Sequence, residues 1–326
     1  MRNLLQRYIK YEFWPFWLFY GFLTPVFLYY IFKTKAPAYF CNVNPKIRFG
    51  GFYDYPKMDL LEWISKDVLP QTDFISKEDI HQYSINSYPK VVKPNVGERG
   101  KNVQVLRSNE DWIFYRKEMT EDLLLQDFID DPLEFGLFYV RYPKEENGKL
   151  ISITAKEFLW ITGDGKTTLR NFINQNPRIK STRRELHKKF ENRLDEILRF
   201  DEKLLLSEIG NHYRGTKFLD ASDLITDQLS EKVDQLIKDI PHFYYGRLDV
   251  KTKSIEDLQN GKFVILEVNA ANSEATQLYD PKYSVFDAWK IATNLLKIQY
   301  TVAKQNHELG FPYPKWQPLA KVLLQK

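Results

Sequence analysis

Two segments late in the chain carry oxygen-bearing side chains in a pattern that suits a divalent cation. The first, residues 246–250, reads Gly-Arg-Leu-Asp-Val and places Asp249 on a predicted strand. The second, residues 263–269, ends in Glu-Val-Asn and places Glu267 and Asn269 on another. Carboxylate and amide oxygens are the ligands that magnesium prefers. The three residues are therefore candidate ligands of Mg2+ or Mn2+ beside the phosphates of a nucleotide.

The stretch between these strands, residues 253–262, predicts a hairpin connection, because Asn260 and Gly261 form a typical tight-turn pair. Such a hairpin would bring the three candidate ligands together. The alternative at this point is an ordinary antiparallel hairpin with a few charges on its solvated face.

An earlier segment combines a lysine with a glycine-bearing loop. Residues 88–103 contain a predicted strand that ends near Lys93 and continues into a loop with Gly97 and Gly100. Backbone N–H groups of such a loop close around phosphate oxygens, and the lysine supplies a point charge. The spacing is neither that of the P-loop nor that of the dinucleotide fingerprint. Taken alone, the loop fits an ordinary hairpin turn equally well.

The order of these motifs resembles the ATP-grasp superfamily. Between the lysine strand and the carboxylate strands lie residues 123–129, which read Leu-Leu-Leu-Gln-Asp-Phe-Ile, and then Glu134. Residues 161–169 and 211–216 are similar to segments of the cyanophycin synthetase branch, and the whole arrangement is similar to the D-alanine–D-alanine ligase branch as well. The resemblance covers about residues 73–284.

The resemblance implies an α+β ATP-grasp fold, in which two α+β subdomains hold ATP between them. We expect a membrane-associated segment (1–35), a reduced N-terminal substrate region (36–86), an ATP-grasp domain (87–284) with a lid subdomain (87–128) and a metal-binding subdomain (129–284), and a C-terminal helical extension (285–326).

The resemblance also gives individual residues a role in nucleotide binding. Lys93 would contact the phosphates, and residues 96–102 would close over them. The backbone of residues 126–128 would receive the adenine, and Glu134 would hold the ribose hydroxyls. Many relatives begin this hinge with Glu where the chain has Gln126. The implied nucleotide-binding residues are Lys93, Gly97, Arg99, Gly100, Gln126, Asp127, Phe128 and Glu134.

Two arginines are catalytic candidates. Arg247 lies two positions before Asp249, so both side chains point to one face of the predicted strand. Its guanidinium would stabilise the negative charge of a tetrahedral intermediate as an amine attacks an acyl phosphate. The alternative is a salt bridge with Asp249 or Glu267. Arg214, beside Gly215, suits a phosphate or a carboxylate.

These features favour an ATP- and magnesium-dependent ligase that joins a carboxylate to an amine through an acyl phosphate. The substrates would be small or lipid-linked molecules, and a thiol or hydroxyl acceptor stays open. One alternative is a membrane-bound nucleotide-binding module without turnover, against which the intact Lys93, Asp249, Glu267 and Asn269 argue. Another is an ATP-grasp kinase that phosphorylates a hydroxyl.

Composition narrows the class of protein. A net charge of +4, from 47 basic and 43 acidic residues, does not suggest a nucleic-acid binder. A single cysteine, Cys41, excludes an intrachain disulfide and fits a reducing compartment. A homodimer stays open.

The N-terminal region contains an aromatic run, residues 13–32, which has twenty residues and no charge. A helix of this length matches the hydrocarbon layer of a bilayer. Pro15, Pro25 and the many Trp and Tyr side chains favour a broken or interfacial element over a straight span. We expect membrane association with the catalytic domain facing the cytosol, where ATP is found. The alternative is an aromatic core helix or arm.

Overall fold

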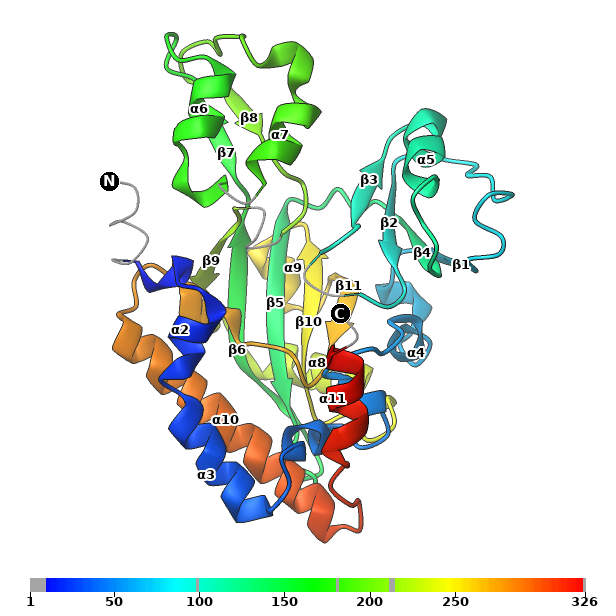
Figure 1. Cartoon of the computed structure of the whole chain (residues 1–326), viewed down its shortest axis with the longest axis vertical. Helices are drawn as coiled ribbons and strands as arrows, with labels where there is room; N and C mark the ends of the chain where they lie inside the picture. Colours follow the sequence, from blue (N-terminus) through cyan, green and yellow to red (C-terminus); the bar gives the residue numbers. More distant parts are fainter. Residues whose placement is uncertain (1–9, 98–99, 180–181, 211–214, 325–326) are drawn as a thin grey trace.

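The computed structural model describes residues 10–97, 100–179, 182–210 and 215–324, and its largest element is a five-stranded antiparallel sheet (Figure 1). The strand order is β11-β10-β5-β6-β9. The strands are β5 (Leu133–Val140), β6 (Lys149–Glu157), β9 (Lys217–Asp220), β10 (Tyr245–Thr252) and β11 (Val264–Asn269). This sheet is the floor on which the candidate site is built.

The two faces of this sheet differ in polarity because successive strand residues point to opposite sides. One face carries apolar side chains such as Leu137, Leu248 and Ile265, all fully buried. The helices α4 (Met58–Leu61), α8 (Asp227–Ile237) and α9 (Ile255–Gln259) cover it. In α8, Thr226 caps the first turn, and the apolar residues lie one helical turn apart, so a single stripe meets the sheet.

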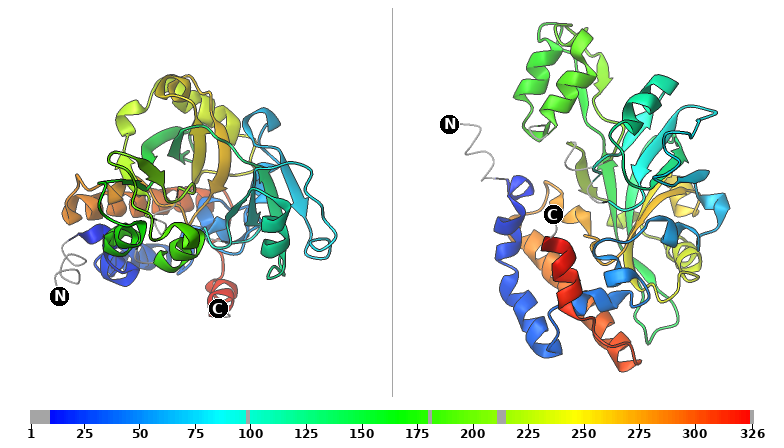
Figure 2. Two further views of the ribbon diagram at one scale, coloured as in Figure 1. Left: turned by 90° about the horizontal axis from the view of Figure 1, so that it is seen from above. Right: turned by 45° about the vertical axis from the view of Figure 1, so that its right-hand side comes forward.

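The opposite face is covered only in part. Phe138 and Tyr245 lie under α10 (Val285–Glu308) and α3 (Thr24–Thr34) in a second apolar cluster. Seen from above, α10 and the N-terminal helices lie on one side of the sheet, and α8 and α9 lie on the other (Figure 2). The same face also carries the charged side chains of the candidate site.

A four-stranded antiparallel sheet lies beside the larger one (Figure 1). Its order is β1-β4-β2-β3, with β1 (Thr72–Ile75), β2 (Lys90–Pro94), β3 (Gln104–Leu106) and β4 (Leu123–Asp127). Helix α5 (Asn109–Arg116) packs on it through Trp112 and Tyr115. The sheet holds the segment predicted as a lid and also includes β1, which precedes the predicted start. The subdomain boundaries stay predictions.

A small unit at one end of the molecule has a core of its own (Figure 1). It consists of the two-stranded sheet of β7 (Trp160–Thr162) and β8 (Lys203–Leu205) with α6 (Leu169–Gln175) and α7 (Arg183–Lys189). Buried residues such as Ile173, Leu186 and Leu198 fill its interior. Part of the segment similar to the cyanophycin synthetases lies here, away from the larger sheet.

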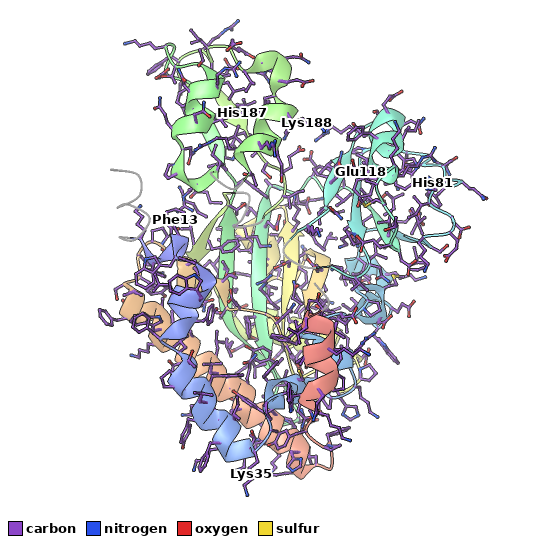
Figure 3. The ribbon with its side chains drawn as sticks, in the orientation of Figure 1. Phe13, Lys35, His81, Glu118, His187 and Lys188 are labelled. Carbon is purple, nitrogen blue, oxygen red and sulfur yellow. The ribbon has the colours of Figure 1, made fainter. Side chains whose placement is uncertain are left out.

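The aromatic N-terminal run folds into two helices, α2 (Phe16–Gly21) and α3, which lie along α10 (Figures 1 and 2). Pro15 directly precedes α2 and Pro25 lies in the first turn of α3, so the helix is broken as predicted. Figure 3 labels Phe13 and Lys35, near the two ends of this run.

The run divides its side chains between protein and solvent. Phe19, Leu23 and Tyr30 are buried against α10 and its neighbours. Trp17 and Phe32 are exposed at 71% and 79%. None of the helices in the described ranges combines the length and the apolar character needed to cross a bilayer. Part of the run therefore belongs to the core, as the alternative interpretation expected, and membrane association stays a prediction.

We expect Phe19→Ala to lower the free energy of unfolding by about 3–5 kcal/mol, because it leaves a cavity in the core. Phe32→Ala is the matched control and should change it by less than about 0.5 kcal/mol, since an exposed ring loses little. Urea unfolding followed by fluorescence measures both. Equal effects of the two substitutions would contradict the division of the run into a buried and an exposed side.

Candidate functional site

A cavity of about 1000 Å3 is lined by residues of both larger sheets. Eleven residues predicted from the sequence line it: Lys93, Gly97, Gly100, Gln126, Asp127, Phe128, Glu134, Arg247, Asp249, Glu267 and Asn269. They come from segments that lie far apart in the sequence. The predicted residues Arg99 and Arg214 lie outside the described part of the chain.

The predicted hairpin of β10 and β11 is confirmed. Asp249 pairs with Glu267, and Arg247 pairs with Asn269. Residues paired across two strands share a face, so these four side chains project to the same side of the sheet. This is the face opposite the α8 core.

The predicted hairpin connection, residues 253–262, is not an irregular loop. It contains α9, which begins after Ser254, whose side chain accepts a hydrogen bond from the backbone of Asp257. Asn260 follows the helix, and Gly261 has a φ of +71°. The Asn-Gly pair therefore ends a short helix, which is a common use of a left-handed glycine.

Asp249 is the most heavily paired carboxylate of the site. Arg247 donates to it through two nitrogens, with Nε 2.9 Å from Oδ1 and Nη2 3.1 Å from Oδ2. Asn269 Nδ2 lies 3.2 Å from Oδ2, and Lys156 Nζ lies 3.2 Å from Oδ1. Burial alone would raise the pKa of Asp249, but Arg247 and Lys156 outweigh it and lower the pKa to about 2. The predicted salt bridge of Arg247 is thus present.

Lys156 was not predicted from the sequence. Its Nζ lies 2.8 Å from Glu134 Oε1 as well as near Asp249, and all three residues are buried. Burial lowers the pKa of Lys156, but the two carboxylates more than compensate, so the pKa is raised. Ser152, Thr154 and Lys156 alternate with apolar residues along β6, and that alternation is the signal that would have placed Lys156 on the polar face.

Two glycines make room for these charges. Gly136 on β5 lies opposite Asp249, and a Cβ there would come within 3.1 Å of Arg247 Cδ. At Gly210, a Cβ would lie 2.4 Å from Glu134 Oε1. A larger residue at either position would displace a charged side chain from its partners.

Two lysines flank the second carboxylate, Glu267. Lys93 Nζ donates to the carbonyl oxygen of Leu266 at 2.9 Å. Lys57 lies 3.6 Å from Glu267 Oε1 and donates to the carbonyl oxygen of Gly97, so it joins the predicted loop to β11. Burial lowers the pKa of Lys93 to about 8, although Glu267 acts in the opposite direction. Lys57, like Lys156, was not among the predicted site residues.

The predicted hinge lies at the end of β4. Gln126 is buried, and its Nε2 donates to Thr72 Oγ1 at 3.1 Å. Asp127 forms an ion pair with Lys90, and Phe128 follows it at the wall of the cavity. These residues border the cavity as expected, and their contact with a nucleobase stays a prediction.

The charges of the site alternate in sign. The cations Lys57, Lys93, Lys156 and Arg247 surround the carboxylates of Asp249 and Glu267. Such a wall can accept an anion on its cations and a divalent cation on its carboxylates. A polyphosphate carrying a metal ion combines both properties.

Comparison with protein-family models gives no match, and a search among curated proteins gives none either. Among solved structures the chain is similar to D-alanine–D-alanine ligase from Bacillus anthracis (16% identity, TM-score 0.44, covering 78% of this chain and 69% of that one). It is also similar to L-amino acid ligase from Bacillus licheniformis (13%, 0.40, 74% and 46%) and to a bifunctional glutathione synthetase from Pasteurella multocida (14%, 0.37, 74% and 35%).

The chain spans about a third of the length of the glutathione synthetase. All three TM-scores lie below 0.5, so a functional assignment depends on the residues of the site.

We expect the stabilising effect of Asp249 to depend on pH in the acid range. Its pKa is about 2 in the folded protein against an ordinary value of 3.8. The ionised carboxylate therefore stabilises the fold fully above about pH 4, and this contribution is lost as the pH falls towards 2. The difference in unfolding free energy between wild type and Asp249→Asn should be about 1 kcal/mol smaller at pH 3 than at pH 5. Urea unfolding at both pH values measures it, and an unchanged difference would contradict the pairing.

Proposed function

We propose that the protein is an ATP-dependent ligase that joins a carboxylate to an amine through an acyl phosphate. The observation that carries this proposal is the convergence of eleven sequence-predicted residues on one cavity, with cations and carboxylates alternating on its wall. Lys93 enters from β2 of the four-stranded sheet and Lys57 from the residue before α4, whereas Lys156 and Arg247 come from the larger sheet. The triphosphate of ATP would lie between the two groups.

The two carboxylates and Asn269 fit a magnesium ion. Asp249 and Glu267 lie directly opposite each other, and Asn269 lies beside them, with its amide Nδ2 donating to Asp249 Oδ2 at 3.2 Å. The oxygen of the same amide is the atom that would bind the ion. Within the described ranges, no three acidic, histidine or cysteine side chains gather into a metal-binding group. The mixed set suits magnesium, which takes one or two carboxylates and completes its shell with phosphate oxygens and water. When bound, the ion would neutralise charge on the phosphates.

The proposed reaction has two steps. A substrate carboxylate oxygen attacks the γ-phosphorus of ATP, and ADP leaves. The nitrogen of an amine then attacks the acyl carbon, phosphate leaves, and the nitrogen loses a proton. Arg247 would stabilise the negative charge on the oxygen of the tetrahedral intermediate, since its guanidinium is fixed by Asp249 and by the carbonyl oxygen of Glu274.

We also propose that the protein works at the surface of an anionic bilayer facing the cytosol. The support is an exposed apolar side of α2 and α3, with Lys33 and Lys35 exposed at its end. The exposed residues of this side are Trp17, Phe22, Leu28, Tyr29 and Phe32. Aromatic side chains suit the headgroup region, and lysines suit anionic lipid.

The experiment that tests the reaction combines the purified chain with ATP, magnesium and a small-molecule cell extract. We expect ADP and phosphate to form, with a new product mass, and hydroxylamine to convert the intermediate into a hydroxamate. Asp249→Asn and Glu267→Gln should abolish turnover, because each removes one of the charges that hold the metal. Arg247→Lys should lower turnover more than ATP affinity.

Other outcomes distinguish the alternatives. A phosphorylated product that is stable to hydroxylamine would indicate a kinase. ATP binding without turnover would indicate a silent nucleotide-binding module. Release of AMP and pyrophosphate would replace the acyl phosphate by an adenylate.

We expect the affinity for Mg-ATP to fall as the pH rises above 8. The pKa of Lys93 is about 8 in the empty protein, so its charge is lost above that pH and binding must restore it. The loss should approach about tenfold per pH unit. Lys93→Arg should bind with little change in this range, because arginine keeps its charge. Calorimetry between pH 7 and 9 measures both, and identical pH profiles would remove Lys93 from the phosphate site.

We expect the double substitution Phe22→Ser and Phe32→Ser to weaken binding to phosphatidylcholine vesicles that contain phosphatidylserine. Each exposed ring is worth about 2 kcal/mol when buried, so the bound fraction should fall by roughly tenfold or more. Phe200→Ser is the control, since Phe200 is 84% exposed but lies near the small β7–β8 unit. Cosedimentation measures the effect. Wild-type protein that stays with the supernatant would contradict membrane binding.

A further inference from the structure

The cavity extends past Arg247 into a region away from the residues proposed to hold the nucleotide and the metal. This region is walled by α2, by α10 and by the loop that follows β11. Its lining residues include Tyr20, Tyr245, Glu274, Tyr279, Leu295 and Leu296. Most of this surface is aromatic or aliphatic, and Glu274 supplies a carboxylate to it. We refer to this region as the α10 chamber.

Two tyrosines hold the carboxylate of Glu274. Tyr20, on α2, donates its hydroxyl to Oε1, and Tyr279 donates to Oε2 at 3.2 Å. Burial raises the pKa of both tyrosines well above 10, and the charge of Glu274 raises it further. Both hydroxyls therefore stay protonated and donate hydrogen bonds to the carboxylate.

Glu274 has no ion-pair partner among the side chains that the structure describes. Arg247 contacts its main-chain carbonyl oxygen at 3.2 Å, while the guanidinium is committed to Asp249. A carboxylate that lines a cavity and shares its neighbouring guanidinium with another carboxylate is stabilised further when a ligand supplies a positive charge. The aliphatic wall of α10, with Leu295 and Leu296, would contact an apolar body attached to that charge.

We propose that Glu274, held by Tyr20 and Tyr279, binds the ammonium group of an acceptor substrate whose remaining body is apolar. The ammonium gives one proton to water before its nitrogen attacks the acyl carbon. This inference rests on the proposed ligase function and names the class of its amine substrate. Arg247 touches both Asp249 and Glu274, so an amine held in the α10 chamber lies next to the end of the cavity where the acyl phosphate would form. Tyr20 gives the N-terminal segment a direct part in substrate binding.

The test uses the full chain with Mg-ATP and three amine–alcohol pairs of similar shape: hexylamine and hexanol, cyclohexylamine and cyclohexanol, phenethylamine and phenylethanol. We expect at least one amine to bind about tenfold more tightly than its alcohol, because only the amine forms a charge-assisted hydrogen bond with Glu274. Calorimetry measures the affinities. Equal affinity within every pair would overturn the proposal.

Substitutions of Glu274 and Tyr279 test whether these residues cause the preference for an amine over its alcohol. Glu274→Gln keeps the shape and removes the charge, so it should abolish the difference between amine and alcohol while Mg-ATP affinity stays within about twofold. An amine preference that survives this substitution would overturn the proposal. If Glu274→Gln does not fold, Tyr279→Phe is used in its place. Loss of one tyrosine donor should change the affinity for the amine several-fold and leave the affinity for the alcohol unaffected. Equal effects on the two affinities would contradict the assignment.

Two different results distinguish failure of the proposed ligase function from failure of the proposed role of Glu274. If wild-type protein does not bind Mg-ATP, the nucleotide site is wrong whatever the amines do. If Mg-ATP binds and the amine preference is missing, only the role of Glu274 is wrong.

Discussion

A carboxylate placed in the middle of a sheet face determines how the site is built. Asp249 is buried on the polar face of the larger sheet, and a buried charge is tolerated only when it is paired and hydrogen-bonded. Its partners Arg247 and Lys156 come from β10 and β6, on either side of β5, where Gly136 leaves the space between them. A slip of one residue in any of these strands would turn the charges into the apolar core, so the register and the site depend on each other.

The part of the site that follows from local periodicity could be predicted from the sequence. Period-two alternation puts Arg247 and Asp249 on one face of their strand, and Glu267 and Asn269 on one face of theirs, while the short connection predicts that the two strands pair. Lys156 could not be found in this way, because its distance from Asp249 is set by the pairing of β6 with β5, which no short motif encodes. The helix α9 was missed for a different reason: an Asn-Gly pair ends short helices as well as making tight turns.

The N-terminal run was the least predictable element. Burial in a protein core and burial in a bilayer both remove apolar surface from water and are both favourable. Composition alone therefore does not distinguish the two environments. The prolines did predict the break between α2 and α3. Which side of each helix faces inward depends on α10, far later in the chain, and only the folded arrangement shows that Phe19 is core and Trp17 is surface.

Polar contacts stabilise one end of the cavity, and apolar core packing stabilises the other. Near Glu267, the larger sheet is joined to the segment that contains β2 by a few polar contacts, such as those of Lys57 and Lys93. The α10 chamber is fixed by core packing, because Phe19 anchors α2 and thereby positions Tyr20 on Glu274. Polar contacts across a cavity open at lower cost than a packed core. If the proposed function holds, the side of the four-stranded sheet is the part suited to admit a nucleotide, and the α10 chamber would stay preorganised for the proposed acceptor.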